Sequence, residues 1–431
     1  MQKIILGCLI LFSSAACTEK RNGYDELAGK MKSESSISFT KEKAMEIVQT
    51  GFNAGDSYGE VWIRDYNTFI ELSAEVFPPD SLKENLLVFF RLQGDDGNIV
   101  DGFIPRENTG GGYDYIYSDL EPRYAGHKNT VETDQESSLV QTVYKYVQAT
   151  GDRSILEEEI GDRTVLQRME DAFDFLLNER YAEEYGLLWG ATTADWGDVQ
   201  PEHDWGVYLT DDSHLCVDIY DNAMFLIALE DFMELAPDKK DEWMEVHERI
   251  AKNSREVLWD EENQKFHPHR YLEDSPFPDE FNEDEIFYHG GTAVAIEAGL
   301  LDKDEIKASL EQMVENVEAA GAGSIGLTLY PPYPEGFFKN EGMYPYGYQN
   351  GGDWTWFGAR MIQQLVVYGF VEEAYEQLLP MTRRVEENDG FYEWYTVDNE
   401  PEGSGTFRGS AGVLWKAIEL LEERLDIQTT Q

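Results

Sequence analysis

Two carboxyl side chains stand apart from the many acidic residues of this chain because aromatic residues adjoin them. Asp195 is followed by Trp196, and Glu393 is followed by Trp394. Apolar surroundings raise the pKa of a carboxyl group and suit a general acid, so we predict that Asp195 donates a proton. Glu393 is predicted to activate water as a general base. The alternatives are an acidic surface loop for Asp195 and a structural carboxylate packed among rings for Glu393.

A glycine hinge before an apolar segment carries a second group of polar and aromatic residues. It reads Tyr-Gln-Asn-Gly-Gly-Asp-Trp-Thr-Trp-Phe over residues 348–357. Glycines allow a sharp turn, and a helix start offers unpaired N–H groups to a ligand. Carboxylates and amides bind hydroxyl groups, and flat rings cover C–H faces. We therefore predict that a sugar contacts Gln349, Asn350, Asp353, Trp354 and Trp356.

The segment Trp62-Ile63-Arg64-Asp65 places two opposite charges side by side. One of them can face a pocket while the other braces it. Trp62, Arg64 and Asp65 are therefore predicted to bind substrate. A purely structural ion pair is the alternative.

Four more polar or aromatic residues are candidates for binding substrate. Asp134 lies in Glu-Thr-Asp-Gln-Glu at residues 132–136, where it or Thr133 could instead cap a helix. Trp196 would wall the pocket, and Asp198 could hold either Asp195 or a sugar hydroxyl. His289 precedes two glycines and is predicted to be a substrate or structural contact.

Composition and motifs argue against several other functions. The chain has 85 Asp+Glu against 34 Lys+Arg, a formal net charge of −51, so nucleic acids and polyanions do not suit it as partners. The acid excess is equally consistent with a solubility or salt adaptation. The seven His show no paired metal spacing, and neither a phosphate-binding loop nor a nucleophile elbow occurs. We predict no metal site, although acidic loops could bind calcium.

Helices must position these residues, because apolar residues recur at helical spacing in about twelve segments. No comparable run of strands intervenes. The expected helices are 40–51, 62–76, 81–92, 134–150, 155–179, 213–235, 239–258, 292–300, 303–319, 354–368, 372–385 and 409–425.

Short and long connections alternate between these helices. Links 77–80, 236–238 and 369–371 are short, which makes the helices they join antiparallel neighbours. The links before the even-numbered helices are mostly long and carry the polar and aromatic residues. This alternation predicts an all-α (α/α)6 barrel with the even helices inside and their N-termini at the pocket. A superhelical repeat array is the alternative, but the loops are unequal and no sequence period is present.

The first residues have the features of an export signal. Lys3 precedes the apolar run 4–12, and small residues follow before Cys17. This run is too short to span a bilayer, so 1–16 are predicted to be a signal peptide that is removed. Lipid would attach to Cys17, a flexible tether would run through 17–38, and one barrel domain would occupy 39–431. Simple secretion is the alternative, because Ser14 stands where a lipoprotein signal more usually has Leu.

Several motifs resemble those of the six-hairpin glycosidases, a clan of neutral and alkaline invertases, trehalases, processing α-glucosidase and debranching enzymes. Residues 62–65 resemble the early Phe-Val-Arg-Asp of the invertases, and 348–352 are similar to their Tyr-His-Asn-Gly-Gly. Residues 392–395 resemble the late motif with the general base. Residues 194–198 resemble the Asp-Trp-Asn-Asp of related disaccharide phosphorylases, which contains the general acid. The trehalase Gln-Trp-Asp-Tyr-Pro run is absent.

The resemblance implies an inverting, exo-acting glycoside hydrolase on an α-glucosidic bond of a di- or oligosaccharide, with Asp195 as acid and Glu393 as base. It implies no obligatory cofactor. The expected location is the bacterial cell envelope, with the membrane contacted only through the lipid. A disaccharide phosphorylase and a surface lipoprotein that binds glycans without cleaving them are the alternatives. A sugar epimerase on the same barrel would need paired pocket histidines.

Overall fold

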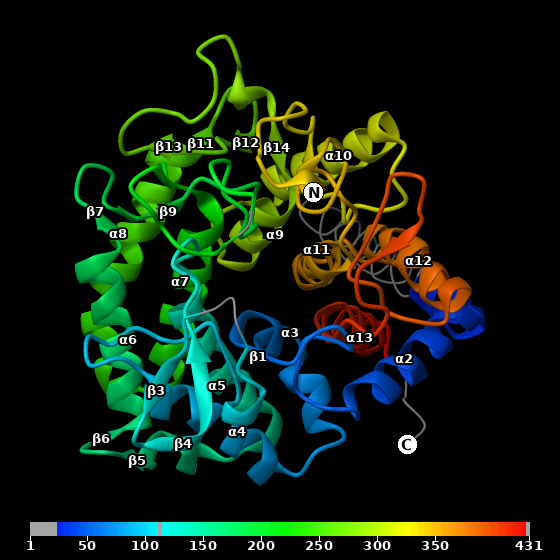
Figure 1. Cartoon of the computed structure of the whole chain (residues 1–431). Coiled ribbons are helices and arrows are strands. Elements are labelled where there is room, and N and C mark those ends of the chain that lie inside the picture. The colour runs from blue at the N-terminus through cyan, green and yellow to red at the C-terminus, as the bar shows by residue number, and fades with distance from the viewer. Residues whose placement is uncertain (1–23, 111–113, 205, 428–431) are drawn as a thin grey trace, which may run out of the picture.

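Helices dominate the computed structural model, which describes residues 24–110, 114–204 and 206–427 (Figure 1). Between Ser35 and Arg424 the helices are α2 Ser35–Val48, α3 Ile63–Ala74, α4 Pro79–Leu92, α5 Gln135–Thr150, α6 Val165–Glu179, α7 Ile219–Leu235, α8 Lys240–Leu258, α9 His289–Glu297, α10 Lys303–Ala320, α11 Thr355–Tyr368, α12 Val371–Asn388 and α13 Arg408–Arg424.

Six of these helices form a closed inner ring. Helix α3 packs against α5, and the contacts continue through α7, α9, α11 and α13 back to α3. These are the even-numbered helices of the expected order, and the others lie outside them (Figure 1). The predicted (α/α)6 barrel is therefore confirmed.

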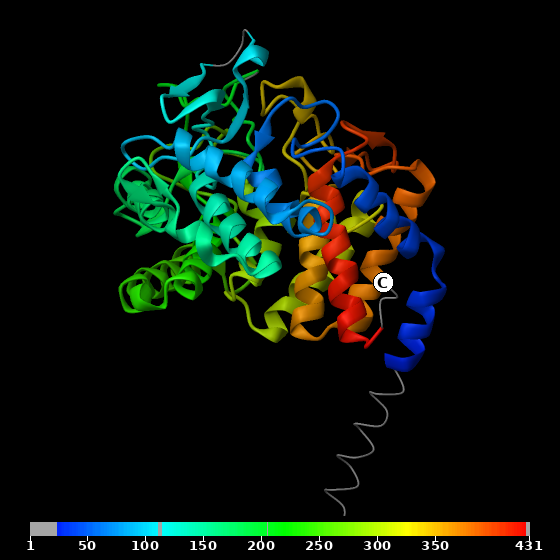
Figure 2. The same cartoon turned by 90° about the horizontal axis from the view of Figure 1, so that it is seen from below.

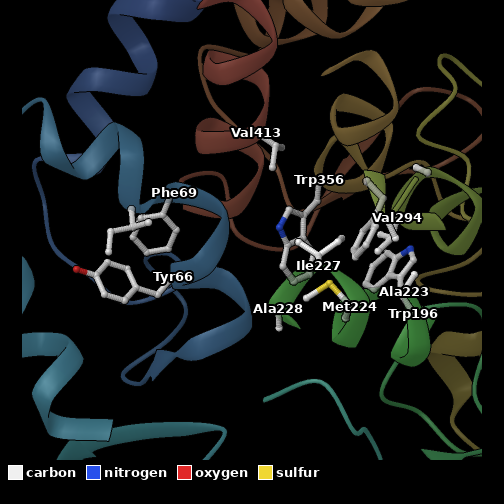
Figure 3. Close-up of a cluster of buried hydrophobic side chains, with 14 of the residues drawn as sticks. Tyr66, Phe69, Trp196, Ala223, Met224, Ile227, Ala228, Val294, Trp356 and Val413 are labelled. Atoms are coloured by element: carbon white, nitrogen blue, oxygen red, sulfur yellow. The ribbon is translucent and has the colours of Figure 1, made fainter. Parts of the chain in front are cut away.

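Burial along the helices explains which of them lie inside. In α7 every residue from Ile219 to Leu229 is buried, as an inner helix requires. In α8 the buried residues are only Trp243, Ile250, Ser254 and Leu258, which form one stripe. In Figure 3, Met224 and Val294 lie close to Trp196 and Trp356, whereas Tyr66 packs beside Phe69 of the same helix in another part of the core.

Glycine lets the last inner helix approach the first. A Cβ at Gly412 of α13 would lie 2.5 Å from Phe69 Cα of α3, closer than packed atoms allow. The two backbones therefore touch where the ring closes.

Short strands lie in the long connections and were not predicted from the sequence. They are β1 Val61–Trp62, β2 Gly102–Pro105, β3 Ile116–Ser118, β4 Glu121–His127, β5 Glu159–Ile160, β6 Arg163–Thr164, β7 Tyr181–Ala182, β8 Leu187–Leu188, β9 Gly190–Ala191, β10 Leu215–Val217, β11 Trp259–Asp260, β12 Lys265–Phe266, β13 Arg270–Tyr271, β14 Phe287–Tyr288, β15 Leu329–Tyr330, β16 Trp394–Tyr395 and β17 Pro401–Glu402. An antiparallel four-stranded sheet has the order β1-β2-β4-β3, with Val61 opposite Phe103 and Phe103 opposite Gly126. Strands and long loops gather at one end of the helices (Figure 2).

Two expected helices begin more than one residue later than predicted. Helix α6 begins at Val165, because Thr164 caps it through the N–H of Gln167 after the β5–β6 hairpin. Helix α7 begins at Ile219, because Asp218 accepts from the N–H of Asp221 and the preceding residues pair as β10. Helical spacing does not reveal such starts when a strand precedes the helix.

The N-terminal part of the described chain differs from the expected tether. Residues 24–33 are helical, and Leu27 and Met31 are buried in the core. The prediction of a flexible segment is therefore wrong from residue 24 onward. The predicted signal peptide and Cys17 lie outside the described residues. Within the described ranges, none of the helices has the length and apolarity to cross a membrane.

Candidate active site

A cavity of about 550 Å³ opens at the N-terminal ends of the inner helices. Its walls come from the first turn of α3, the start of α11, the sheet residues Asp101 and His127, and the loops before α7 and α13. Of the fourteen residues predicted to act on substrate, nine line it: Trp62, Arg64, Asp65, Trp196, Asp198, Gln349, Trp354, Trp356 and Glu393.

Glu393 reaches the cavity from the loop between α12 and α13. Its Oε1 accepts a hydrogen bond of 2.8 Å from the Tyr58 hydroxyl, and its Oε2 accepts one of 3.2 Å from the Ser404 N–H. Burial raises the pKa of Glu393, whereas these donors lower it. The carboxylate is thus held in a fixed orientation, and its oxygens keep lone pairs that can accept a proton from water.

Asp198 faces the cavity from the loop between β9 and β10. The Gln349 amide donates to its Oδ1 at 2.8 Å, and the Asp198 N–H donates to Gln349 Oε1 at 3.2 Å. One side chain of the glycine hinge therefore fixes both the backbone and the carboxyl group of Asp198. Oδ2 remains available to a ligand, since none of the described residues bonds to it.

The structure does not place Asp195 among the cavity-lining residues. Its two oxygens accept hydrogen bonds of 2.7 Å from the N–H groups of Gly290 and Gly291, at the start of α9. Burial raises its pKa as expected, but a Cβ at Gly291 would lie 2.9 Å from Asp195 Oδ1, so the glycines are needed for this close approach. Asp195 therefore ties the loop between β9 and β10 to α9. This geometry does not support its predicted role as general acid.

Arg64 braces the cavity through a network that includes Asp134. Its Nε lies 3.0 Å from Asp134 Oδ2, its Nη1 donates to the Trp196 carbonyl at 3.1 Å, and its Nη2 pairs with Glu132. Tyr220 also donates to Asp134, at 2.7 Å. Asp134 stands at the start of α5 but accepts no capping hydrogen bond there, so the capping alternative is wrong. It lies behind Arg64 and does not line the cavity.

Asp65 and Asp101 are buried acids in the cavity wall. Burial raises the pKa of Asp65 to about 8, with Glu393 and Asp101 adding to the rise. Burial likewise raises the pKa of Asp101 to about 7. Oδ1 of Asp65 is buried without a hydrogen-bond partner, so it can accept or donate a hydrogen bond to a ligand hydroxyl.

Three further predicted contacts hold the framework and do not line the cavity. His289 is hydrogen-bonded to Asn316 and the Ile325 carbonyl. Asn350 donates to the carbonyls of residues 333 and 343. Asp353 accepts from Ser324 and pairs with Arg384 at 2.9 Å. Each therefore joins a loop to its neighbour, and of the roles predicted for His289 the structural one fits.

The aromatic residues differ in their exposure to the cavity. Trp196 stacks on Phe357 with ring centroids 4.2 Å apart and meets Trp354 and Trp356 edge to face. These three tryptophans are buried and form a fixed wall. Trp62 is half-buried, and its ring is better placed to stack on a sugar.

The sequence did not indicate Tyr58, Asp101 or His127, and it placed Tyr348 and Trp394 in motifs without predicting that they line the cavity. Asp101 and His127 reach the site through the unpredicted β1–β4 sheet. Tyr58 stands four residues before Trp62, and that proximity was the one signal available for it. Among the described residues no group of His, Cys, Asp and Glu is arranged to hold a metal ion.

A barrel of this kind, with Asp198 and Glu393 each held by a side-chain donor in its cavity, has the features of a glycoside-active enzyme. The chain matches the family model of the glycosyl hydrolase 94 superfamily, catalytic domain, over residues 26–376 and belongs to that family. The predicted membership of the six-hairpin glycosidase clan is thereby confirmed. No curated protein matches the chain.

Solved structures share the fold at low sequence identity. The GH63 mannosylglycerate hydrolase from Thermus thermophilus, in complex with Tris and D-glycerate, is 17% identical with a TM-score of 0.60, over 88% of this chain and 99% of that one. A rhamnosidase from Klebsiella oxytoca with rhamnose bound is 12% identical with a TM-score of 0.58, over 89% of this chain and 63% of that one. Family and fold together assign a glycosidase or phosphorylase activity.

Proposed function

We propose that this protein is an inverting, exo-acting glycoside hydrolase that cleaves an α-glucosidic bond in a di- or oligosaccharide. The observation that carries the proposal is that two carboxylates from distant loops line one cavity, each fixed by a side-chain donor. Glu393 is held by Tyr58, and Asp198 is held by Gln349. Asp198 takes the role of general acid that the sequence suggested for Asp195.

The arrangement accounts for each proton in the reaction. Asp198 gives its proton to the glycosidic oxygen as the bond to the anomeric carbon breaks. Glu393 takes a proton from a water molecule, whose oxygen forms the new bond from the opposite face of the sugar. Such a reaction inverts the anomeric configuration. Trp62, Asp65 and Gln349 would bind the sugar in the cavity.

Hydrolysis suits the cavity better than phosphorolysis. A phosphate nucleophile needs cationic donors beside the anomeric carbon. Among the described residues that line the cavity, Arg64 is the one Lys or Arg, and its guanidinium is already bound by Glu132, Asp134 and the Trp196 carbonyl. Water needs only the Glu393 carboxylate.

The volume of the cavity supports a small substrate. About 550 Å³ falls within the range of sites that enclose a single small molecule. Glucosidic linkage follows from the resemblance to invertases and α-glucosidases. The Thermus relative is named for mannosylglycerate hydrolysis, so mannosides belong beside glucosides in any test.

The decisive experiment incubates the purified protein with sucrose, trehalose, maltose, other α-glucosides and α-mannosides, with and without inorganic phosphate. We expect a free sugar whose yield does not depend on phosphate, and NMR of the first product should show the anomer opposite to that of the substrate. A sugar phosphate would identify a phosphorylase. Sugar binding without any product would favour a non-catalytic glycan-binding lipoprotein.

A further inference from the structure

The cavity contains an imbalance of charge that bears on which substrates it admits. Five carboxyl groups line it, but only one Lys or Arg among the described residues does so. The carboxyl groups are those of Asp65, Asp101, Glu132, Asp198 and Glu393.

The positive charge of the single guanidinium is already offset by buried carboxyl groups. Glu132 and Asp134 each pair with one of the Arg64 nitrogens, and the third nitrogen donates to the Trp196 carbonyl. An anion that approached Arg64 would therefore meet two carboxyl groups beside one guanidinium.

Two histidines and the nearby helix starts are the other groups that could attract an anion. Burial lowers the pKa of His127 to about 4, so this imidazole is neutral at neutral pH. The Nε2 of His203 is hydrogen-bonded to Thr210. The N-terminus of α3 gives the Ile63 N–H to the Asp101 carbonyl, and that of α9 gives its N–H groups to Asp195. The starts of α3 and α9 therefore offer little of the anion-binding capacity that free N–H groups would provide.

We infer that the cavity selects glycosides whose aglycone is neutral or cationic and rejects those that carry a carboxylate or a phosphate. The inference rests on the proposed glycosidase function and specifies its substrate class. The ionised carboxylates of Glu132 and Glu393 act on a bound anion by like-charge repulsion, which sets specificity by penalising the wrong partner. Asp65 and Asp101, whose pKa values burial raises to about 8 and about 7, add to the repulsion as they ionise. Glu132 acts in two ways, since it adds a negative charge to the wall and also forms an ion pair with the Arg64 guanidinium.

The test uses non-hydrolysable S-linked glycosides that differ only in the charge of a short aglycone. Carboxymethyl, 2-hydroxyethyl and 2-aminoethyl thioglycosides, each made as α-glucoside and α-mannoside, are titrated into the wild-type protein by calorimetry. We expect the carboxymethyl ligand to bind at least tenfold more weakly than the hydroxyethyl ligand, and the aminoethyl ligand at least as tightly. A penalty smaller than tenfold for the carboxymethyl ligand overturns the inference.

Failure of the proposed function gives a different result. If none of the three ligands binds with either sugar, the cavity is not a glycoside site of the proposed kind. If the neutral ligand binds and the anionic one binds equally well, the glycosidase proposal stands and only the charge inference fails.

A pair of variants tests why the carboxymethyl ligand should bind more weakly than the hydroxyethyl ligand, a loss of affinity called the penalty here. Glu132→Gln removes a negative charge beside Arg64, so the penalty for the carboxymethyl ligand should fall at least threefold. Asp238→Asn makes the same change of charge on an exposed residue that follows the C-terminus of α7, at the end of the helix away from the cavity. This variant should leave the penalty unchanged. An unaltered penalty in Glu132→Gln would show that charge is not its cause.

Discussion

Tyr58 and Glu393 lie 335 residues apart in the sequence, and a hydrogen bond of 2.8 Å joins them. Tyr58 precedes the first inner helix, and Glu393 precedes the last one. The bond therefore crosses the junction where the ring closes and holds the proposed base in the cavity wall. A donor to Oε1 also stabilises the ionised carboxylate, the form that accepts a proton from water.

Replacing Tyr58 with Phe should move the acid limb of the kcat/KM profile to higher pH. The hydroxyl lowers the pKa of Glu393 against the effect of burial, so its loss should raise that pKa further. Activity at slightly acidic pH should fall more than activity at neutral pH. Tyr144→Phe is a matched control, because Tyr144 donates to Glu234 away from the cavity. An unchanged acid limb in Tyr58→Phe would mean that Glu393 is not the base.

The two proposed catalytic carboxyls should respond differently to the leaving group. Removal of either should lower turnover about 10²–10⁴-fold, the usual contribution of general acid–base catalysis. Asp198→Asn should recover most of its activity with glycosyl fluorides or nitrophenyl glycosides, whose leaving groups need no proton. Glu393→Gln should remain inactive with both kinds of substrate, because water still needs activation. Equal losses on every substrate in Asp198→Asn would remove it from the acid role.

Asp195→Asn should behave as a change in positioning. The Asn side chain can accept from only one of the N–H groups of Gly290 and Gly291, which leaves a buried donor unpaired at a cost of about 1–3 kcal/mol. We expect a lower melting temperature and a similar loss of kcat on activated and ordinary substrates. Selective recovery with a glycosyl fluoride would instead identify Asp195 as the acid, as the sequence had suggested.

The buried acids predict how stability varies with pH. Asp65 has a folded-state pKa of about 8 against an ordinary value of 3.8, so between these values the folded protein binds a proton that the unfolded chain has lost. Its contribution to stability is present at low pH and is lost as pH rises toward 8. The difference in melting temperature between Asp65→Asn and wild type should therefore change in favour of the variant as pH rises from 5 to 9. A constant difference across that range, with Asp238→Asn as reference, would contradict the assignment.

The first residues give a prediction about location that stands on the sequence alone. We propose that Cys17 carries lipid, because it follows an apolar run and small residues. Cys17→Ser should then move the protein from the membrane fraction to the soluble fraction without changing its specific activity. Identical fractionation of variant and wild type would exclude the anchor.

The barrel was predicted well from the sequence because the features that indicate it are distributed over the whole chain. Helical periodicity and the lengths of connections depend on many residues, so an error at one helix start, such as that of α7, does not change the topology. The cavity was also located correctly, since long loops precede the inner helices and must meet at one end.

Individual roles within the loops could not be assigned in the same way. Asp195 and Asp198 are three residues apart in one loop, and only the backbone decides which faces the cavity. Asp195 has a φ of 57°, a left-handed conformation that no sequence period indicates. Asn350 and Asp353 have the side chains that a sugar site needs, but they bind the loops to each other. Side chains that bind a sugar and side chains that join loops form the same kinds of hydrogen bond, so the residue types alone could not distinguish these two roles.

Closure of the ring between α3 and α13 has a consequence for the order in which the protein becomes functional during synthesis. The α3 segment that receives Gly412 is synthesised before the rest of the ring, whereas Glu393, Phe407 and α13 leave the ribosome only after the other five inner helices. A nascent chain that lacks them has an open ring and an exposed apolar seam, and it also lacks the residue proposed to activate water. Catalytic competence and protection of that seam are therefore acquired in the same late step.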